Sequence, residues 1–297
     1  MYGYGNMISP TNRLFSGGGA VVNPLWNGLQ AYYTADSTPN DATGNGNNLT
    51  LVNGATYDTG IINNGFSFDG VNDYANVASN IGLTNDFSIS LWFNFDTLSG
   101  FSPLFQSANF ITLANESLSI YISGDKLIFQ MKGFNGTFYT QTSETSFSVS
   151  TNYNVQVTYN NTTKKADFYI NGVKDTISQD TIFFTCTSLD INNGFDIGRR
   201  RTNAFADGMI DEVGMWNREL TSTEVTELYN SGAGKQYPYT NPLWNGLQAY
   251  YTADSTPNDA LGTYNGTLVN GATYGTGIIN QGFSLDGVND YVDIGNN

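Results

Sequence analysis

The loop at residues 35–48 concentrates side chains that could hold a metal ion. Its sequence, ADSTPNDATGNGNN, includes the carboxylates of Asp36 and Asp41 and the amides of Asn45, Asn47 and Asn48. Hard cations such as calcium bind through several carboxylate, amide and carbonyl oxygens. Asp41 with Asn47 or Asn48 is therefore a candidate calcium site, although no EF-hand spacing is present. The same residue types also stabilise tight turns through Asx hydrogen bonds, and this alternative stays open.

A second acidic group lies in the late segment GMIDEVGMW. If Val213 faces the core of a strand, simple alternation places Asp211 beside it. If Ile210 faces the core instead, Glu212 follows it. Either register directs one carboxylate to the buried side unless a bulge intervenes. A buried carboxylate needs a cation or several hydrogen-bond donors, so metal ligation and a hydrogen-bonded bulge are both open.

Three consecutive arginines stand out in a chain with 11 basic residues: Arg199, Arg200 and Arg201. They precede the late strand, in IGRRRTNAFADG, with Phe205 close by. Guanidinium groups bind acidic sugars, sulfates and carboxylates in a forked geometry, so this loop is a candidate carbohydrate site. A solvated loop that offsets local negative charge is the alternative. Aromatic rings that could stack on a sugar are those of Tyr139, Phe134 and Trp26.

The composition excludes several classes of function. The 297 residues contain no histidine, which rules out Ser-His-Asp and Cys-His triads and histidine-ligated zinc. A net charge of −15 disfavours binding to nucleic acids and anionic membranes. The single cysteine, Cys186, lies in an apolar run and is expected in the core. No apolar run approaches the roughly twenty residues that cross a bilayer.

A long internal repeat defines the domain organisation. Residues 23–42 recur unchanged at 241–260, and residues 53–74 recur at 270–291 with three changes. The period of about 215 residues exceeds that of solenoids and propellers, and indicates a duplicated domain. We predict an N-terminal arm with a Gly-rich hinge at 1–22, a first copy at 23–236, and at 237–297 a linker and the start of a second, incomplete copy. The arm lacks the pattern of a secretory signal.

The periodicity inside copy one predicts an all-β fold. FSISLWFNF (87–95) alternates apolar and mostly polar residues, and YNVQVTY (153–159) with ADFYINGVKD forms a predicted hairpin. Further short strands are predicted in SLSIYI, KLIFQMK and TFYTQTS. One helix is predicted in LTSTEVTELYNSG, with a capping box formed by Thr221 and Glu224 and a stop at Gly232. We expect a two-sheet antiparallel sandwich with one short C-terminal helix that closes an edge.

Three segments resemble the laminin-G-like members of the concanavalin A-like lectin/glucanase superfamily: FSFDGVNDYANV, ADFYINGV and DGMIDEVGMWNRELTSTEVTELYNSG. The resemblance covers about 23–236 and implies a jelly-roll sandwich in which the first strand lies beside the last. In such a fold the 57 or so residues of copy two cannot close a core, so we expect the natural chain to continue or copy two to dock on a neighbour.

The resemblance also implies a structural calcium ion near the loop after the first strand. The predicted ligands are Asp41, Asn47, Asn48, Asp207 and Glu212, and Asp207 is the best-placed late partner if the first and last strands are antiparallel neighbours. Related glucanases carry a Glu, Asp, Glu trio on one strand, and nothing here matches it. Asp211 and Glu212 are expected on opposite faces. We therefore predict that the protein is not an enzyme.

Two functions agree with these features. The first is a non-catalytic adhesion or carbohydrate-binding protein on a phage or virus surface, a fibre or decoration that joins other virion proteins through its arm and faces a cell-surface glycan. The second is a calcium-stabilised carbohydrate-binding module of a secreted bacterial surface protein; a ligand-free spacer is a third. Partners would be a glycan or polysaccharide, with possible homo-oligomers. Predicted carbohydrate contacts are Arg199, Arg200, Arg201, Phe205 and Tyr139.

Overall fold

The computed structural model describes residues 13–16, 19–22, 24–78, 81–83, 85–98, 100–107, 117–133, 135–177, 182–183, 194–201, 203–237, 249–260, 264–278 and 280–295. The chain divides into two compact units. One is Gly28–Tyr237 and contains the predicted first copy almost entirely. The other comprises Met1–Asn27 and Pro238–Asn297. Cys186 and Phe134 lie outside the described residues.

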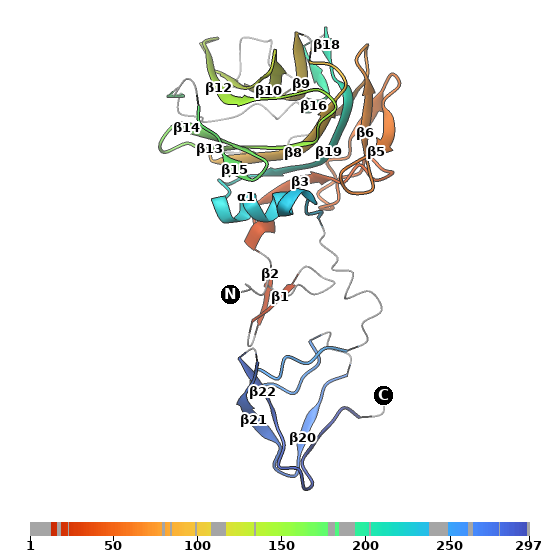
Figure 1. The fold of residues 1–297 in the computed structure, drawn as a ribbon, viewed down its shortest axis with the longest axis vertical. Helices are drawn as coiled ribbons and strands as arrows, with labels where there is room; N and C mark the ends of the chain where they lie inside the picture. Colours follow the sequence, from red (N-terminus) through yellow and green to blue (C-terminus); the bar gives the residue numbers. More distant parts are fainter. Residues whose placement is uncertain are drawn as a thin grey trace. The chain divides into compact units, whose positions relative to one another are not determined.

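The unit Gly28–Tyr237 is a sandwich of two antiparallel sheets, as predicted (Figure 1). The seven-stranded sheet has the order β12 (Phe138–Ser146), β11 (Lys126–Lys132), β10 (Ser117–Ser123), β9 (Phe101–Ser107), β16 (Phe195–Ile197), β7 (Tyr74–Val77) and β4 (Thr50–Val52). The second sheet has the order β15 (Val173–Lys174), β14 (Lys165–Ile170), β13 (Tyr153–Asn160), β8 (Phe87–Phe95), β19 (Asp207–Trp216), β6 (Asn64–Asp69) and β5 (Thr56–Thr59), with β3 (Leu29–Tyr33) as its eighth strand on β19. A small hairpin joins β17 (Arg199–Arg200) to β18 (Ala204–Phe205).

The late strand β19 occupies the middle of the eight-stranded sheet. It pairs with β3 in the register Val213↔Tyr33 and with β8 in the register Ile210↔Phe93. It also pairs with β6, where Ile210 lies opposite Phe66. The predicted neighbourhood of the first and last strands is therefore confirmed. Strands from the beginning, middle and end of copy one meet on β19.

The core lies between the two sheets and follows the predicted alternation. In β8 the core positions are Phe87, Ile89, Leu91, Phe93 and Phe95, each with 0–1% of its surface exposed. Phenylalanines of the opposite sheet, such as Phe105 and Phe129, are completely buried against them. Burying one such ring contributes about 1.5–3 kcal/mol, so these contacts carry much of the stability of the sandwich.

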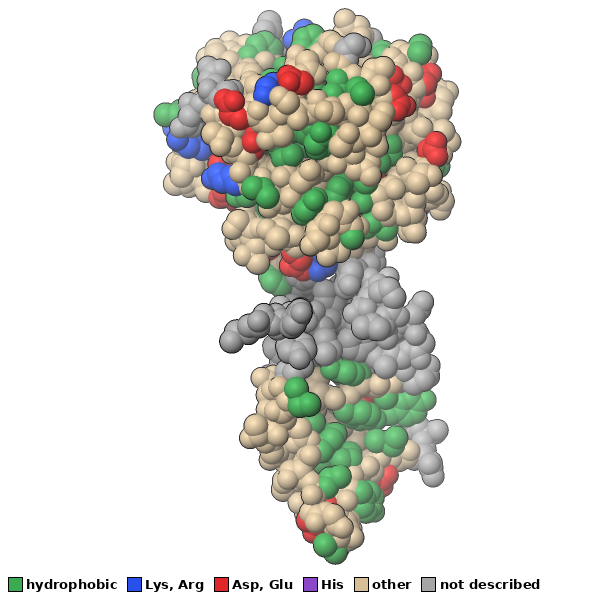
Figure 2. All heavy atoms as spheres, viewed as in Figure 1, with side chains coloured by type: hydrophobic (Ala, Val, Ile, Leu, Met, Phe, Trp, Pro, Cys, Tyr) green, Lys and Arg blue, Asp and Glu red, His purple; other side chains and the backbone are tan. Residues whose placement is uncertain are grey.

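The surface of the sandwich is rich in uncharged polar groups. On the face shown in Figure 2, backbone and uncharged polar atoms dominate, and lysine and arginine are sparse. This agrees with the 12% of charged residues in the whole chain. Such a surface offers many hydrogen-bonding groups and few strong positive fields.

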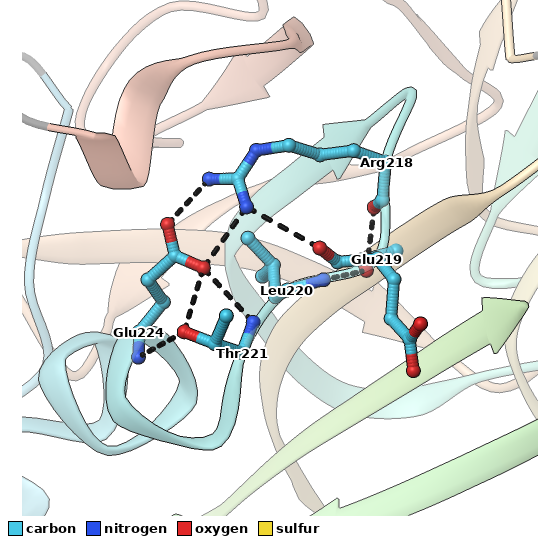
Figure 3. A network of polar contacts seen from close by, with 6 residues as sticks. Arg218, Glu219, Leu220, Thr221 and Glu224 are labelled. Atoms are coloured by element: carbon cyan, nitrogen blue, oxygen red, sulfur yellow. Dashed lines mark hydrogen bonds and ion pairs between the residues drawn. The ribbon is translucent and has the colours of Figure 1, made fainter.

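The helix α1 (Ser222–Tyr229) covers the outer face of the eight-stranded sheet rather than an edge, contrary to expectation (Figure 1). Its capping box is present as predicted: Thr221 accepts from the Glu224 backbone N–H, and Glu224 accepts from the Thr221 N–H (Figure 3). Arg218 donates to both Glu224 carboxylate oxygens, at 2.9 and 2.6 Å. The helix ends at Tyr229 because Asn230 adopts a left-handed conformation, with φ of 48°, so the stop lies before Gly232.

The second unit contains short β-ribbons. In the arm, β1 (Arg13–Ser16) pairs with β2 (Gly19–Val22), and the 3-10 helix η1 spans Pro24–Trp26. In copy two, β20 (Thr267–Val269) pairs with β23 (Tyr291–Asp293), and β21 (Thr273–Thr276) pairs with β22 (Gln281–Ser284). Within the described residues, copy two forms two-stranded ribbons and no sandwich, as expected for a fraction of a domain. No described helix has the length and hydropathy of a membrane span.

Candidate functional site

A polar groove lies on the outer face of the eight-stranded sheet. The alternation that directs Phe93 and Phe95 into the core leaves Asn94 on this outer face. Helix α1 occupies another part of the same face, where Tyr229 stacks on Trp92 with ring centroids 5.6 Å apart. Beyond Trp92 the surface is hollowed into a groove of about 370 Å³, lined by Asp58, Thr59, Gly60, Ser67, Asn94, Asp96, Ser150, Asn152, Gly208 and Met209.

A glycine allows the strands beneath the groove to approach each other. Gly208 has φ of 127°, a conformation that side chains rarely adopt. A Cβ atom there would lie 2.3 Å from the backbone oxygen of Asn94. Any larger residue would therefore push β19 away from β8. The side chain of Asn94 is held in turn by Asn152, whose Oδ1 accepts its amide N–H at 2.7 Å. The floor of the groove is thus fixed before a ligand arrives.

The groove is rich in hydrogen-bond acceptors and contains no positive charge. Its lining has the carboxylates of Asp58 and Asp96, two amides and three hydroxyls, and neither lysine nor arginine. Only Met209 adds an apolar side chain. Carboxylates and amides of this kind bind the hydroxyl groups of sugars or the N–H groups of amines, and they repel anions. The volume is within the range of about 300–1,000 Å³ that is common for ligand pockets.

The loop at 35–48 is organised around Asp41. One carboxylate oxygen accepts from the Tyr32 N–H at 3.1 Å and from the N–H and hydroxyl of Thr43 at 3.0 and 2.7 Å. The other accepts from the backbone and amide N–H groups of Asn47, both at 3.3 Å. Asn48 accepts from the Asp41 N–H at 2.9 Å. Because protein donors surround both oxygens, this arrangement favours the Asx-turn interpretation and does not fit a calcium site as it stands.

The late carboxylates lie apart from Asp41. A bulge interrupts β19 between Asp211 and Gly214, and Glu212 adopts φ of 50°. The bulge places Asp211 and Glu212 together on the outer side of the sheet, so the expectation of opposite faces is wrong. Asp211 accepts from the N–H groups of Ile61 and Ile62, at 2.8 and 3.2 Å.

Glu212 accepts hydrogen bonds from one residue near the start of the domain and one near its end. It accepts from the Tyr32 hydroxyl at 2.5 Å and from the Gln236 amide at 2.9 Å. The same amide donates to Asp36 at 2.8 Å, so Asp36 joins this cluster rather than the Asp41 group. Asp207 lies elsewhere, opposite Asp69 and against Gly70. Among the described residues, no group of three or more acidic or cysteine side chains has an arrangement that would hold a metal.

Burial controls the ionisation of Asp211 and Glu212. Desolvation raises the pKa of Asp211 to about 7, aided by the charge of Asp36 and opposed by the three backbone N–H groups that Asp211 accepts. The pKa of Glu212 is also raised, by burial first and then by Asp211. Both side chains are almost completely buried, with 0% and 3% exposed, and neither lines the groove.

The three arginines lie by the outer face of the seven-stranded sheet, and the guanidinium groups of Arg199 and Arg200 are engaged within the protein. Arg199 donates twice to Asp196, at 2.9 and 2.7 Å, and its guanidinium lies 3.7 Å from the centre of the Tyr74 ring. Arg200 is 5% exposed and lies over Tyr121 and Phe101, at 4.1 and 4.6 Å. Arg199 therefore offsets local negative charge, as the alternative interpretation predicted.

The other predicted sugar contacts do not form one site. Arg201 is exposed, and its backbone N–H donates to Gln106. Phe205 is half-buried opposite Arg199 in the small hairpin. Tyr139 lies opposite the core residue Met131 and packs on Phe183, so it faces the interior and not the arginines. Trp26 is buried.

Reasoning from the sequence missed the groove. The alternation in 87–95 places Asn94 at an outward position, but Asp58 comes from the distant strand β5, and Ser150 and Asn152 come from the connection before β13. The sequence carries no local signal for the groove, because its lining comes from segments that are far apart in the chain.

Comparisons with known proteins agree with the architecture. The domain 4 of AbnA, an extracellular arabinanase of Geobacillus stearothermophilus solved with arabinotriose, is 20% identical, with a TM-score of 0.54; the match covers 67% of this chain and 97% of that one. The binding domain of Paraclostridial Mosquitocidal Protein 1 is 21% identical, with a TM-score of 0.55 over 70% of this chain. The binding domain of botulinum neurotoxin serotype D is 16% identical, with a TM-score of 0.54 over 70% of this chain. At these identities the likeness concerns the fold.

The match spans about half of each toxin binding domain, 53% in both cases. A search among functionally curated proteins gives no match. A family profile described as concanavalin A-like lectin/glucanases superfamily matches residues 69–226, which is more than half of the chain. The two-sheet sandwich and this match together confirm the resemblance seen in the sequence. The chain belongs to the concanavalin A-like lectin/glucanase superfamily.

Proposed function

We propose that this protein is a non-catalytic glycan-binding protein that holds neutral or amino sugars in the groove on the eight-stranded sheet. The observation that carries the proposal is the groove itself, a preformed hollow of about 370 Å³ with carboxylates, amides and hydroxyls on its walls. The lectin-like fold and the arabinotriose bound to a domain of similar fold support it. The guanidinium groups of Arg199 and Arg200 contact Asp196 and Tyr121 by the other sheet, which favours the groove over the arginine loop as the sugar site.

The lining selects against acidic sugars. A sialic acid or sulfate in the groove would meet Asp58 and Asp96 without a compensating cation, in a chain of net charge −15. A hydroxyl or ammonium group would find acceptors. The groove is open and polar, so a few hydrogen bonds of about 0.5–1.5 kcal/mol each correspond to weak binding by a single site.

A domain that binds weakly through one site is effective when several such domains are displayed on one particle or surface. The near-verbatim duplication supports this setting, because additional copies increase avidity without any new contact. We propose an adhesion role on a virion surface, with the arm at 1–22 joining other virion proteins. A surface or secreted bacterial module is the alternative setting. A sequencing of the neighbouring reading frames, or detection in purified particles, separates the two.

The non-catalytic part of the proposal rests on the position of the buried carboxyls. Glycoside hydrolysis needs a carboxylic acid kept protonated beside the scissile bond. Among the described residues, burial raises the pKa of the carboxyl groups of Asp196, Asp211 and Glu212, which accept hydrogen bonds from backbone and side-chain donors and do not line the groove.

A glycan array probed with the full chain tests the proposal. The groove variants Asn94→Ala and Asp96→Asn should lose at least tenfold in binding to neutral glycans, whereas Arg201→Ala on the other sheet serves as the matched control and should bind normally. Circular dichroism of each variant verifies folding. Binding lost in Arg201→Ala but retained in both groove variants would place the site on the arginine loop. Release of shortened glycan on incubation would contradict the absence of catalysis.

A further inference from the structure

Two ribbons in the described part of copy two repeat the local structure of the corresponding strands of copy one. The ribbon β21–β22 pairs Tyr274 with Phe283, as β5–β6 pairs Tyr57 with Phe66. The ring centroids are 5.9 Å apart in the first pair and 5.8 Å in the second. Likewise β20–β23 matches β4–β7. We call residues 29–77 the copy-one segment and residues 247–294 the copy-two segment.

Hydrogen bonds in the loops are repeated as well. Asp259 accepts from the Tyr250 N–H at 2.8 Å, as Asp41 accepts from the Tyr32 N–H at 3.1 Å. In the turn after β22, Asp286 accepts from the N–H of the residue two positions on at 2.8 Å, the distance found at Asp69. The two described ribbons of copy two and these turns therefore have the copy-one conformation without the rest of a sandwich.

The partners of the two segments differ. In copy one, β6 pairs with β19 and β7 pairs with β16. In the described part of copy two, β22 and β23 each have one ribbon partner and leave the other edge open. Apolar side chains that copy one buries are exposed there: Leu285 is 52% exposed where Phe68 is 4%, and Ile294 is 47% exposed where Val77 is 3%. Figure 2 shows hydrophobic side chains on the surface of the described part of copy two. An exposed edge beside apolar groups is a surface prepared for strand pairing.

The linker is long enough for the copy-two segment to reach β19 of its own chain. Tyr237, the last residue of the unit Gly28–Tyr237, packs on Tyr32 with ring centroids 5.9 Å apart. Leu29 begins the same strand as Tyr32, roughly 10 Å away along the strand. The stretch 238–246 precedes Leu247, the counterpart of Leu29, and can span up to about 30 Å. A short linker gives a local concentration of the order of millimolar, so the same chain is the favoured partner at micromolar protein.

We propose that the copy-two segment is an interaction surface for β19 and β16 of the same chain, in competition with the copy-one segment. The sandwich can then close in two ways, with residues 29–77 or with residues 247–294 beside the same two strands. The second closure resembles a circular permutation of the first. It also changes the groove, because Gly275 stands at the position of Asp58.

Three differences favour the copy-one closure, which is the one observed. Asn76 donates to Asp196 at 2.8 Å, and copy two has Asp293 at this position, which would place two carboxylates together. Ala75 is completely buried, and its counterpart Val292 would overfill the site. Leu285 would fill the place of a phenylalanine incompletely. Exchanging these side chains between the copies should therefore shift the balance.

Cysteine pairs in the full chain with Cys186→Ser test the competition. Met209 lies directly opposite Ser67, and Cα atoms in such pairs are about 4.5–5.5 Å apart, which permits a disulfide. Met209→Cys with Ser67→Cys reports the copy-one closure, and Met209→Cys with Ser284→Cys reports the copy-two closure. Met209→Cys with Val288→Cys is the negative control. Cross-linking in a glutathione buffer is read by non-reducing electrophoresis and peptide mapping.

We expect a minor monomeric cross-link through Ser284→Cys that rises severalfold in the background Asn76→Asp with Asp293→Asn. The cross-link through Ser67→Cys should fall in the same background. Cross-linking through Ser67→Cys alone, unchanged by the background, would overturn the proposal. Cross-linked dimers through Ser284→Cys would overturn its assignment to the same chain. Equal cross-linking of the Val288→Cys control would show random collisions and would also overturn it.

Discussion

Asp41→Asn is the sharpest test of how the loop after the first strand is held. The wild-type carboxylate accepts five hydrogen bonds, three on one oxygen and two on the other. Asparagine keeps one acceptor oxygen, while its NH₂ group would face the two donors of Asn47. Each lost bond to a charged group costs about 1.5 kcal/mol at the low end of the usual range, so we expect a loss of about 3 kcal/mol. For a domain of this size that corresponds to about 6–12 °C in Tm.

Equilibrium urea unfolding and calorimetry, each with calcium and with chelator, measure this loss. The matched control is Asp259→Asn, which removes the equivalent carboxylate from copy two and should leave the sandwich transition within about 0.5 kcal/mol of wild type. A loss below about 1 kcal/mol in Asp41→Asn would refute the hydrogen-bond account. Calcium that stabilises the wild type but not Asp41→Asn would establish the predicted calcium site instead.

Glu224→Gln should cost about 1–2 kcal/mol at pH 7, because it weakens the cap and the ion pair with Arg218, and urea unfolding measures it. The pKa of Glu224 is lowered, since these hydrogen bonds outweigh its burial, so the difference should disappear as acid protonates the wild-type side chain. The raised pKa of Asp211 has the opposite sign. The unfolded chain ionises above its ordinary value of 3.8, whereas the folded chain retains the proton up to about 7, so unfolding free energy should fall as pH rises through this window. In Asp211→Asn, urea unfolding in the presence of chelator should show a smaller dependence of the unfolding free energy on pH. An unchanged dependence would contradict the assignment of this effect to Asp211. Trp92→Ala should cost about 3–5 kcal/mol through its lost stack with Tyr229, and a smaller loss would show that the helix docks without it.

Patterns with a short period predicted the fold well. The alternation in 87–95 identified the core side of β8, and the hairpin at 153–174 appears as β13 and β14. The same alternation could not show that Ser88 and Trp92 on the other side are buried too. Trp92 is covered by Tyr229 of α1, and Ser88 forms hydrogen bonds with Arg218 and Leu220 just before that helix. Both partners come from more than a hundred residues later in the chain, and burial by a distant segment leaves no local signal.

The candidate site was less predictable, because it depends on irregular backbone. The bulge that brings Asp211 and Glu212 to one side was foreseen as an exception, but nothing in GMIDEVGMW states where the extra residue falls. Tyr139 was assigned to sugar binding from its residue type, and its partner across the ladder, Met131, shows that it faces inward. The groove required five separate segments to converge, which only the assembled sheet reveals.

The central position of β19 governs the order of events during synthesis. Because β3, β6 and β8 all pair with this late strand, the eight-stranded sheet cannot close until Trp216 has left the ribosome. Between the synthesis of Trp216 and that of Asn297 the ribosome adds roughly eighty residues, which takes about 4–16 s at the usual 5–20 residues per second. All-β domains fold in milliseconds to seconds. Copy one thus closes before its competitor exists, and vectorial translation decides which segment β19 receives first.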